Sequence, residues 1–198
     1  MQTMTHSLIP PSFSRTKERW TFDARTNLPQ KANDLWKINS GVVRGYTWLE
    51  DGSVITLGLW GEGEGVSKTF AQIQPYQLEC LTEVEAFLIP WQNSPENINI
   101  LLSHIQSMQE LVIIRSHKTV ETMLMALFNW LGKKFGKETS QGQLIDLRLT
   151  HQDISDILGT TRVTVTRLLN QLEKQGVIER NPLHRFVLRE EEMWHYEI

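Results

Sequence analysis

Residues 143–189 read QLIDLRLTHQDISDILGTTRVTVTRLLNQLEKQGVIERNPLHRFVLR, and this stretch predicts a compact helical motif followed by a hairpin. A short strand, LIDLRL, leads to Thr150, whose hydroxyl is suited to cap a helix that opens with HQD. Gly159 then permits a sharp turn, because glycine adopts positive φ angles easily. Thr160 or Thr161 caps a second helix that ends at another glycine. With the strands VIER and RFVL, joined by the turn NPLH, the pattern is a winged helix-turn-helix.

The second helix of this motif carries polar side chains in its first turns, and apolar residues alternate with them. The polar set is Arg162, Thr164, Thr166 and Arg167, and the apolar set is Val163, Val165, Leu168, Leu169 and Leu172. The start of a recognition helix enters the major groove of DNA, where arginine donates two hydrogen bonds to guanine. Arginine and threonine are also common on solvated helix faces. Their place in a capped helix-turn-helix favours DNA reading.

The charge of the chain is unevenly distributed. The net charge of all 198 residues is −3. Residues 1–114 carry a net charge of −4, residues 115–189 carry +5, and the last nine residues carry four acidic groups. An acidic half joined to a basic module is typical of a sensing or assembly unit attached to a nucleic-acid-binding unit.

The first half of the chain predicts strands. Residues 1–34 contain three prolines and no clear period, so we expect an arm of limited order. Residues 35–95 consist of short apolar runs separated by turn sequences such as NSG, EDG and GEGEG. This spacing predicts a small antiparallel sandwich or roll. The expected fold class is therefore α+β.

Two helices are predicted between the roll and the winged helix. Ser94 and Pro95 suit the start of a helix that runs to about Arg115. An apolar stripe recurs along it at steps of three and four, at Ile98, Leu101, Ile105, Met108 and Val112. That period is typical of a two-stranded coiled coil, although such a stripe could equally pack on the sheet. A second helix is expected from Thr119 to Phe135.

These residues resemble the Crp/Fnr family of transcription regulators. LTHQDISDILGTTRVTVTRLLNQLEKQGVI is especially similar to the NtcA-type nitrogen regulators of that family, and SGVVRGYTWLEDGSVITLGLWGEGEGVS is similar to the family's sensor roll. The resemblance implies a cyclic-nucleotide-binding-like roll, a dimerisation helix at 96–118 and a winged-helix DNA-binding domain at 119–198. It also implies that the apolar stripe is a homodimer seam.

The resemblance places Arg162 and Arg167 at base-reading positions, with Val163 where many members carry a glutamate that reads cytosine. NtcA-type members share this valine and read GTA…TAC inverted repeats, so a site of that type is expected. Promoter DNA and a second copy of the chain are the expected partners, and RNA polymerase is a further candidate. The full set of expected DNA contacts is Thr161, Arg162, Val163, Thr164, Thr166, Arg167, Lys174 and Arg185.

The sensor half lacks residues on which the family's known effectors depend. Family members hold a cyclic phosphate with an arginine, but residues 45–114 contain none, and Lys68 is the one cation among them. An approximate alignment puts His104 where NtcA-type proteins use an arginine for 2-oxoglutarate, and we expect a polar residue beside the dimer seam there. Lys68 and His104 are therefore weak effector candidates. DNA binding should not require cyclic nucleotide.

Other classes fit the sequence less well. Cys80 is the one cysteine, which excludes a cysteine-based metal cluster, and we expect it to be a small core residue. The stretch from residue 8 to residue 103 contains no histidine, so a metal-dependent enzyme in the roll is not expected. No cofactor, metal or membrane segment is predicted, and the expected compartment is the cytoplasm. A winged helix that binds protein would need an apolar recognition face.

Overall fold

The computed structural model describes residues 18–29, 33–91, 94–140, 142–181 and 185–189. The expected hairpin turn at 182–184, the acidic tail at 190–198 and the first part of the arm lie outside these residues. The elements in chain order are β1 (Arg19–Phe22), β2 (Asp34–Ser40), β3 (Val43–Trp48), β4 (Val54–Trp60), β5 (Gly65–Val66), η1 (Lys68–Phe70), β6 (Gln77–Cys80), β7 (Val84–Pro90), α1 (Pro95–Arg115), α2 (Val120–Phe135), β8 (Gly136–Thr139), β9 (Gly142–Ile145), α3 (His151–Leu158), α4 (Arg162–Lys174), β10 (Ile178–Asn181) and β11 (Arg185–Leu188). No helix within the described ranges is long and apolar enough to cross a membrane.

The N-terminal half is an antiparallel roll, as the sequence predicts. One sheet has the strand order β1-β7-β2-β5 and the other has the order β4-β3-β6. Buried side chains such as Trp60, Leu78 and Cys80 form a shared core in this half. Pairing between strands far apart in the sequence, such as β2 with β7, closes the roll.

Residues 19–29 belong to the roll rather than to an N-terminal arm. Strand β1 pairs with β7, and Phe22 packs edge-on against Trp36 with ring centroids 5.1 Å apart. Leu28 is fully buried, and the indole nitrogen of Trp36 donates to the carbonyl of Pro29 at 2.8 Å. A four-residue strand with a single charged residue gives little signal in the sequence, because its stability comes from distant partners.

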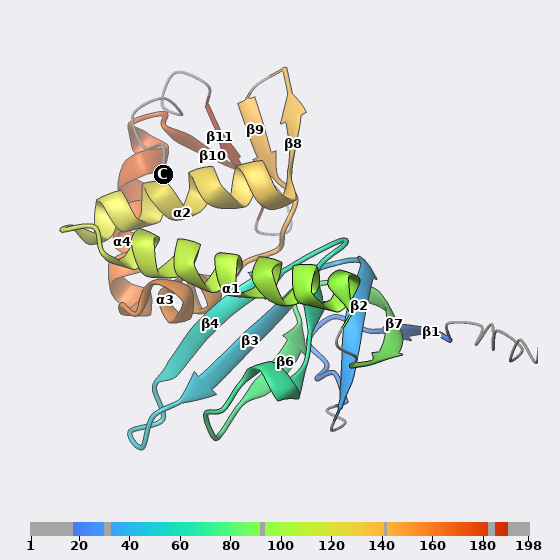
Figure 1. The fold of residues 1–198 in the computed structure, drawn as a ribbon. Helices are drawn as coiled ribbons and strands as arrows, with labels where there is room; N and C mark the ends of the chain where they lie inside the picture. Colours follow the sequence, from blue (N-terminus) through green and yellow to red (C-terminus); the bar gives the residue numbers. More distant parts are fainter. Residues whose placement is uncertain (1–17, 30–32, 92–93, 141, 182–184, 190–198) are drawn as a thin grey trace, which may run out of the picture.

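Helix α1 lies between the roll and α2 (Figure 1). It begins at the expected cap, where the Ser94 hydroxyl accepts a hydrogen bond from the amide of Asn97 at 3.3 Å. One stripe of α1 is buried, and it consists of Asn97, Ile100, His104, Ser107, Leu111 and Ile114. The opposite stripe is exposed, and its large apolar members are Ile98, Leu102, Ile105, Val112 and Ile113.

The C-terminal half is a winged helix joined to the roll by one apolar core. Helix α2 starts at the cap Thr119 and ends at Gly136, as expected. The strands of the wing form one sheet in the order β10-β11-β9-β8. The sequence predicts β9, β10 and β11, but it does not predict β8. The expected strand LIDLRL ends at Ile145. Leu59 of the roll belongs to the same buried cluster as Phe128 of α2 and Ile154 of α3, so the two halves share one interior.

Phe128 tests this shared core. Its side chain is fully buried, and its ring lies 4.9 Å from that of Phe186. We expect Phe128→Ala to lower the free energy of unfolding by about 3–5 kcal/mol, because it leaves a cavity. The control is Val163→Ala at a side chain that is 78% exposed, which should change stability by less than about 0.5 kcal/mol. Equal midpoints for the two variants in denaturant unfolding would contradict this packing.

Candidate nucleic-acid interface

The helix-turn-helix forms as the sequence predicts. The Thr150 hydroxyl accepts from the amide of Asp153, whose carboxylate accepts from the Thr150 amide in return, so α3 starts with a capping box. Gly159 ends α3 in the left-handed conformation, with φ 67° and ψ 39°. Thr161, rather than Thr160, then caps α4. This turn sets the angle between α3 and α4.

Helix α4 has a buried face and a solvent face. Val165, Leu168, Leu169 and Leu172 are buried in the shared core. Val163 does not join them, because it lies in the first turn and is 78% exposed. Arg162, Arg167 and Lys174 are also exposed, and a shallow groove runs along the solvent face beside Arg167 and Lys174. The start of α4 therefore presents two guanidinium groups and one branched apolar side chain to solvent.

The three threonines of the expected site already take part in local hydrogen bonds. The Thr161 hydroxyl accepts from the amide of Thr164 at 3.2 Å, and the two hydroxyl oxygens lie 2.9 Å apart. The Thr166 hydroxyl donates to the carbonyl of Arg162 and lies 2.8 Å from Nδ1 of His151. His151, in the first turn of α3, thus contacts α4. Sequence reasoning did not single it out, because only the packing of α3 on α4 places it there.

The wing carries cations that are tied by ion pairs. Nε of Arg185 lies 3.1 Å from Asp146, which also accepts from Lys137 at 2.6 Å. The hydrogen bond from Lys137 lowers the pKa of Asp146 below its usual range. Arg180 of β10 donates to Asn170 of α4 at 2.7 Å. Arg185 is thus held in the wing sheet, whereas Lys174 is exposed on α4.

Comparison with known proteins places this motif in a family. Residues 122–193 match the model of the Crp-like helix-turn-helix domain. The regulatory protein CysR of Synechococcus elongatus is 38% identical over 179 residues, which cover 88% of this chain and 86% of that protein. The chain belongs to the Crp/Fnr family of transcriptional regulators.

Further relatives agree with this assignment to the Crp/Fnr family. The global nitrogen regulator of Synechococcus elongatus is 29% identical over 163 residues, covering 74% of this chain and 73% of that protein. A CRP-family transcriptional regulator from Thermus thermophilus shares the fold, with a TM-score of 0.75 at 18% identity over 90% of this chain and 98% of that one. These relatives are regulators rather than enzymes.

In this Crp/Fnr member, the side chain of His104 on α1 is buried against the roll. The imidazole stacks on Trp60 with centroids 4.1 Å apart, and Nδ1 lies 3.3 Å from the carbonyl oxygen of Gly65. Burial lowers the pKa of His104 to about 4. The expected position beside the dimer seam is therefore wrong, because His104 lies on the stripe of α1 that faces the roll. Its ring stays neutral near pH 6.5 and gives an anion no positive partner.

Lys68 and the glycine-rich turn occupy other surroundings. Lys68 is exposed at the start of η1, and it does not line the cavity of about 200 Å³ beside His104. That cavity is walled mainly by apolar and aromatic side chains such as Trp60 and Phe70. Glu64 of the GEGEG turn accepts from the amide of Gly61 at 2.7 Å and from Lys134 at 2.9 Å. The turn thus joins the roll to α2.

The buried imidazole predicts a pH dependence of stability. In the unfolded chain His104 binds a proton below about pH 6.5, whereas the folded chain resists protonation down to about pH 4. The free energy of unfolding should therefore fall by up to about 3 kcal/mol as the pH drops through this interval. His104→Phe keeps a ring but cannot titrate, so its unfolding profile should be flatter. His117→Phe is the control. The prediction is contradicted if the free energy of unfolding changes equally with pH in the wild type and in His104→Phe.

Proposed function

We propose that this regulator binds an inverted-repeat DNA site as a homodimer, with α4 of each copy in the major groove. The observation that carries the proposal is the solvent-exposed start of α4, where Arg162, Val163 and Arg167 follow a capped helix and a left-handed glycine turn. The first turns of a recognition helix contact base edges. Two such helices read half-sites about 34 Å apart, one turn of DNA.

The side chains of α4 suit different parts of this interface. A guanidinium group reads guanine through two parallel hydrogen bonds, which is the role we assign to Arg167. Val163 stands where many family members carry a glutamate that accepts from cytosine, and the resemblance to NtcA-type members, which share this valine, makes a GTA…TAC type of site our first choice. Lys174 and the wing residue Arg185 are assigned to phosphates. Of the threonines, Thr164 and Thr166 flank the arginines, and Thr161 caps the helix.

The exposed stripe of α1 supports the homodimer. Val112 is 65% exposed and Leu102 is 58% exposed, and Ile98, Ile105 and Ile113 continue the same face. A contiguous apolar face of this kind marks an interface. Steps of four and three residues join Ile98, Leu102 and Ile105, and Val112 follows seven residues after Ile105, which suits packing against a second copy of the same helix. Leu102 replaces Leu101 and Met108 as a principal member of the seam, because those two are only half-exposed and Met108 packs against the roll.

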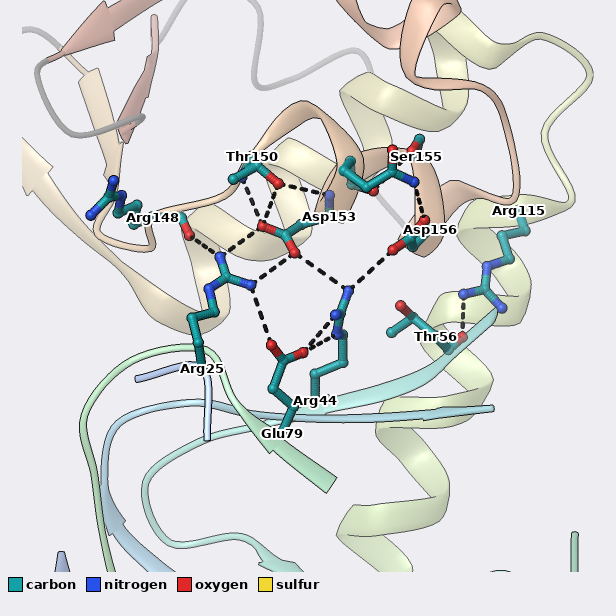
Figure 2. A network of polar contacts seen from close by, with 11 residues as sticks. Arg25, Arg44, Thr56, Glu79, Arg115, Arg148, Thr150, Asp153, Ser155 and Asp156 are labelled. Atoms are coloured by element: carbon teal, nitrogen blue, oxygen red, sulfur yellow. Dashed lines mark hydrogen bonds and ion pairs between the residues drawn. The ribbon is translucent and has the colours of Figure 1, made fainter. Parts of the chain in front are cut away.

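The roll lacks the arginine that would hold a cyclic nucleotide in its interior. The stretch from Gly45 to Ile114 has no arginine, and a buried phosphodiester without a partner costs several kcal/mol. Of the two arginines that border this stretch, Arg44 points to α3 (Figure 2), and Arg115 donates to the carbonyls of Ile157 and Thr56. We therefore propose that DNA binding proceeds without cyclic nucleotide.

Base reading by Arg167 is tested by substitution. Arg167→Ala should weaken binding to the selected site by about 1–3 kcal/mol and flatten the preference at one symmetric base pair. Lys174→Ala should instead weaken all sequences alike and reduce the salt slope by about one. Selection of bound sequences from a random DNA pool, followed by titration of the best site, measures both. Unchanged sequence preference and salt slope in both variants would exclude α4 as the reading helix.

The seam of α1 is tested by a charge. Ile105→Asp would place two like charges at a dry interface and should give a monomer of 23.0 kDa by light scattering. Asn99→Asp adds the same charge at a polar, exposed position of α1 and should leave the dimer intact. A dimer that survives Ile105→Asp would move the interface to another surface.

A further inference from the structure

A cluster of charged side chains, most of them shielded from solvent, joins the roll to α3, the first helix of the helix-turn-helix (Figure 2). We call it the roll–α3 cluster, and its members are Arg25, Arg44, Glu79, Asp153 and Asp156. The first three belong to the roll, and the two aspartates lie one turn apart on α3. The roll contributes two cations and one anion, whereas α3 contributes two anions. The charges are therefore complementary across the joint.

Arg25 makes a two-pronged contact with α3. Its two terminal nitrogens lie 2.9 and 2.8 Å from the two carboxylate oxygens of Asp153. One of them also donates to the carbonyl of Arg148 at 3.3 Å. Burial alone would raise the pKa of Asp153, but the hydrogen bonds from Arg25 and Thr150 lower it on balance. Such a paired geometry fixes direction as well as distance.

Arg44 occupies the centre of the cluster. Its Nε and Nη2 donate to Glu79 at 3.0 and 2.5 Å, which holds the guanidinium group against the neighbouring strand β6. The remaining nitrogen lies 3.5 Å from Asp153 and 3.6 Å from Asp156. Only 8% of the Arg44 side chain and 6% of the Asp153 side chain are exposed. The pair is thus shielded from water. Charge interactions are stronger in such an environment than in water, and the loss of one partner is costly there.

The other end of α3 is held as well. Nε of Arg115, at the end of α1, donates to the carbonyl of Ile157 at 2.6 Å, and its Nη2 donates to the carbonyl of Thr56 on β4. Helix α3 is therefore connected to the roll near both of its ends. Since α4 packs on α3, the same contacts determine where α4 lies relative to α1.

We propose that Arg25 and Arg44 are positioning residues for DNA recognition, which hold α3 and α4 at one orientation on the roll. The inference rests on the proposed function, because the orientation of α4 matters through the distance between two recognition helices in the dimer. Removal of either arginine leaves one guanidinium group to compensate the three carboxylates of the cluster. Separation of α3 from the roll returns the carboxylates of α3 to water, so the variant populates other orientations.

The half-site spacing that the dimer accepts is the decisive measurement. Binding is titrated on inverted repeats whose half-sites are one or two base pairs closer or farther apart than in the best site. The wild type should prefer one spacing at least tenfold over its neighbours. Arg25→Met and Arg44→Met should reduce this ratio below threefold. Arg19→Met is the matched control, because it removes the same charge from an exposed ion pair of the roll with Glu85.

Hydrogen exchange of the full dimer without DNA gives the second measurement. The amides of α3 should exchange at least tenfold faster in Arg25→Met and Arg44→Met than in the wild type, while β3 and α1 keep their protection. Arg19→Met should match the wild type throughout. If Arg44→Met does not fold, the test rests on Arg25→Met. The Arg25 side chain is 38% exposed, so its replacement disturbs the packing of the joint less.

The outcomes separate this inference from the proposed function. A wild-type spacing ratio together with wild-type protection of α3 in Arg25→Met overturns the positioning role. Faster exchange in α3 with an unchanged spacing ratio also overturns it, because the joint then loosens without effect on recognition. If the wild type shows no preference for inverted repeats, the proposed function fails. In that case, unaltered hydrogen exchange of α3 in Arg25→Met and Arg44→Met would separately show that these arginines do not hold α3 on the roll.

Discussion

The packing of α1 against the roll is the constraint on which the rest of the structure depends. One stripe of this helix, from Ile100 to Ile114, is buried against the roll and α2, and it includes polar residues that bond to the roll. Ser107, for example, donates to the carbonyl of Leu59 at 2.7 Å. Because this stripe is committed to the interior, the opposite stripe faces solvent. The same rotation of α1 sets where α2, α3 and α4 stand relative to the roll.

Local signals made the C-terminal half predictable from sequence. Thr150, Gly159 and Thr119 act through hydrogen bonds and backbone angles within a few residues, so a cap or a stop can be recognised without the fold. The face that α1 turns toward the roll was harder to predict from the sequence. Two stripes with similar spacing run along the helix, and periodicity does not tell which one faces the sheet. His104 was misplaced for this reason, and Leu102 was overlooked.

Contacts between distant segments could not be predicted. Strands β1 and β8 are short, and their partners lie far away or across a turn, so composition gives no signal for them. Nor does the charge of the two halves reveal the roll–α3 cluster. Arg44 counts as a cation of an acidic half, yet it compensates aspartates of the basic half. Sequence reasoning found the solvent face of α4, whereas the groups that orient α4 became visible only in three dimensions.

The single cysteine of the chain, Cys80, is inaccessible to oxidants in solution. Cys80 is fully buried in β6, and burial raises the pKa of its thiol to about 11. Thiolate is the reactive form, so both access and ionisation protect this sulfur. The folded protein should therefore not respond to cellular redox state through its cysteine. A cysteine introduced at an exposed position of α4 would then react selectively with a fluorescent maleimide, without prior removal of the native thiol.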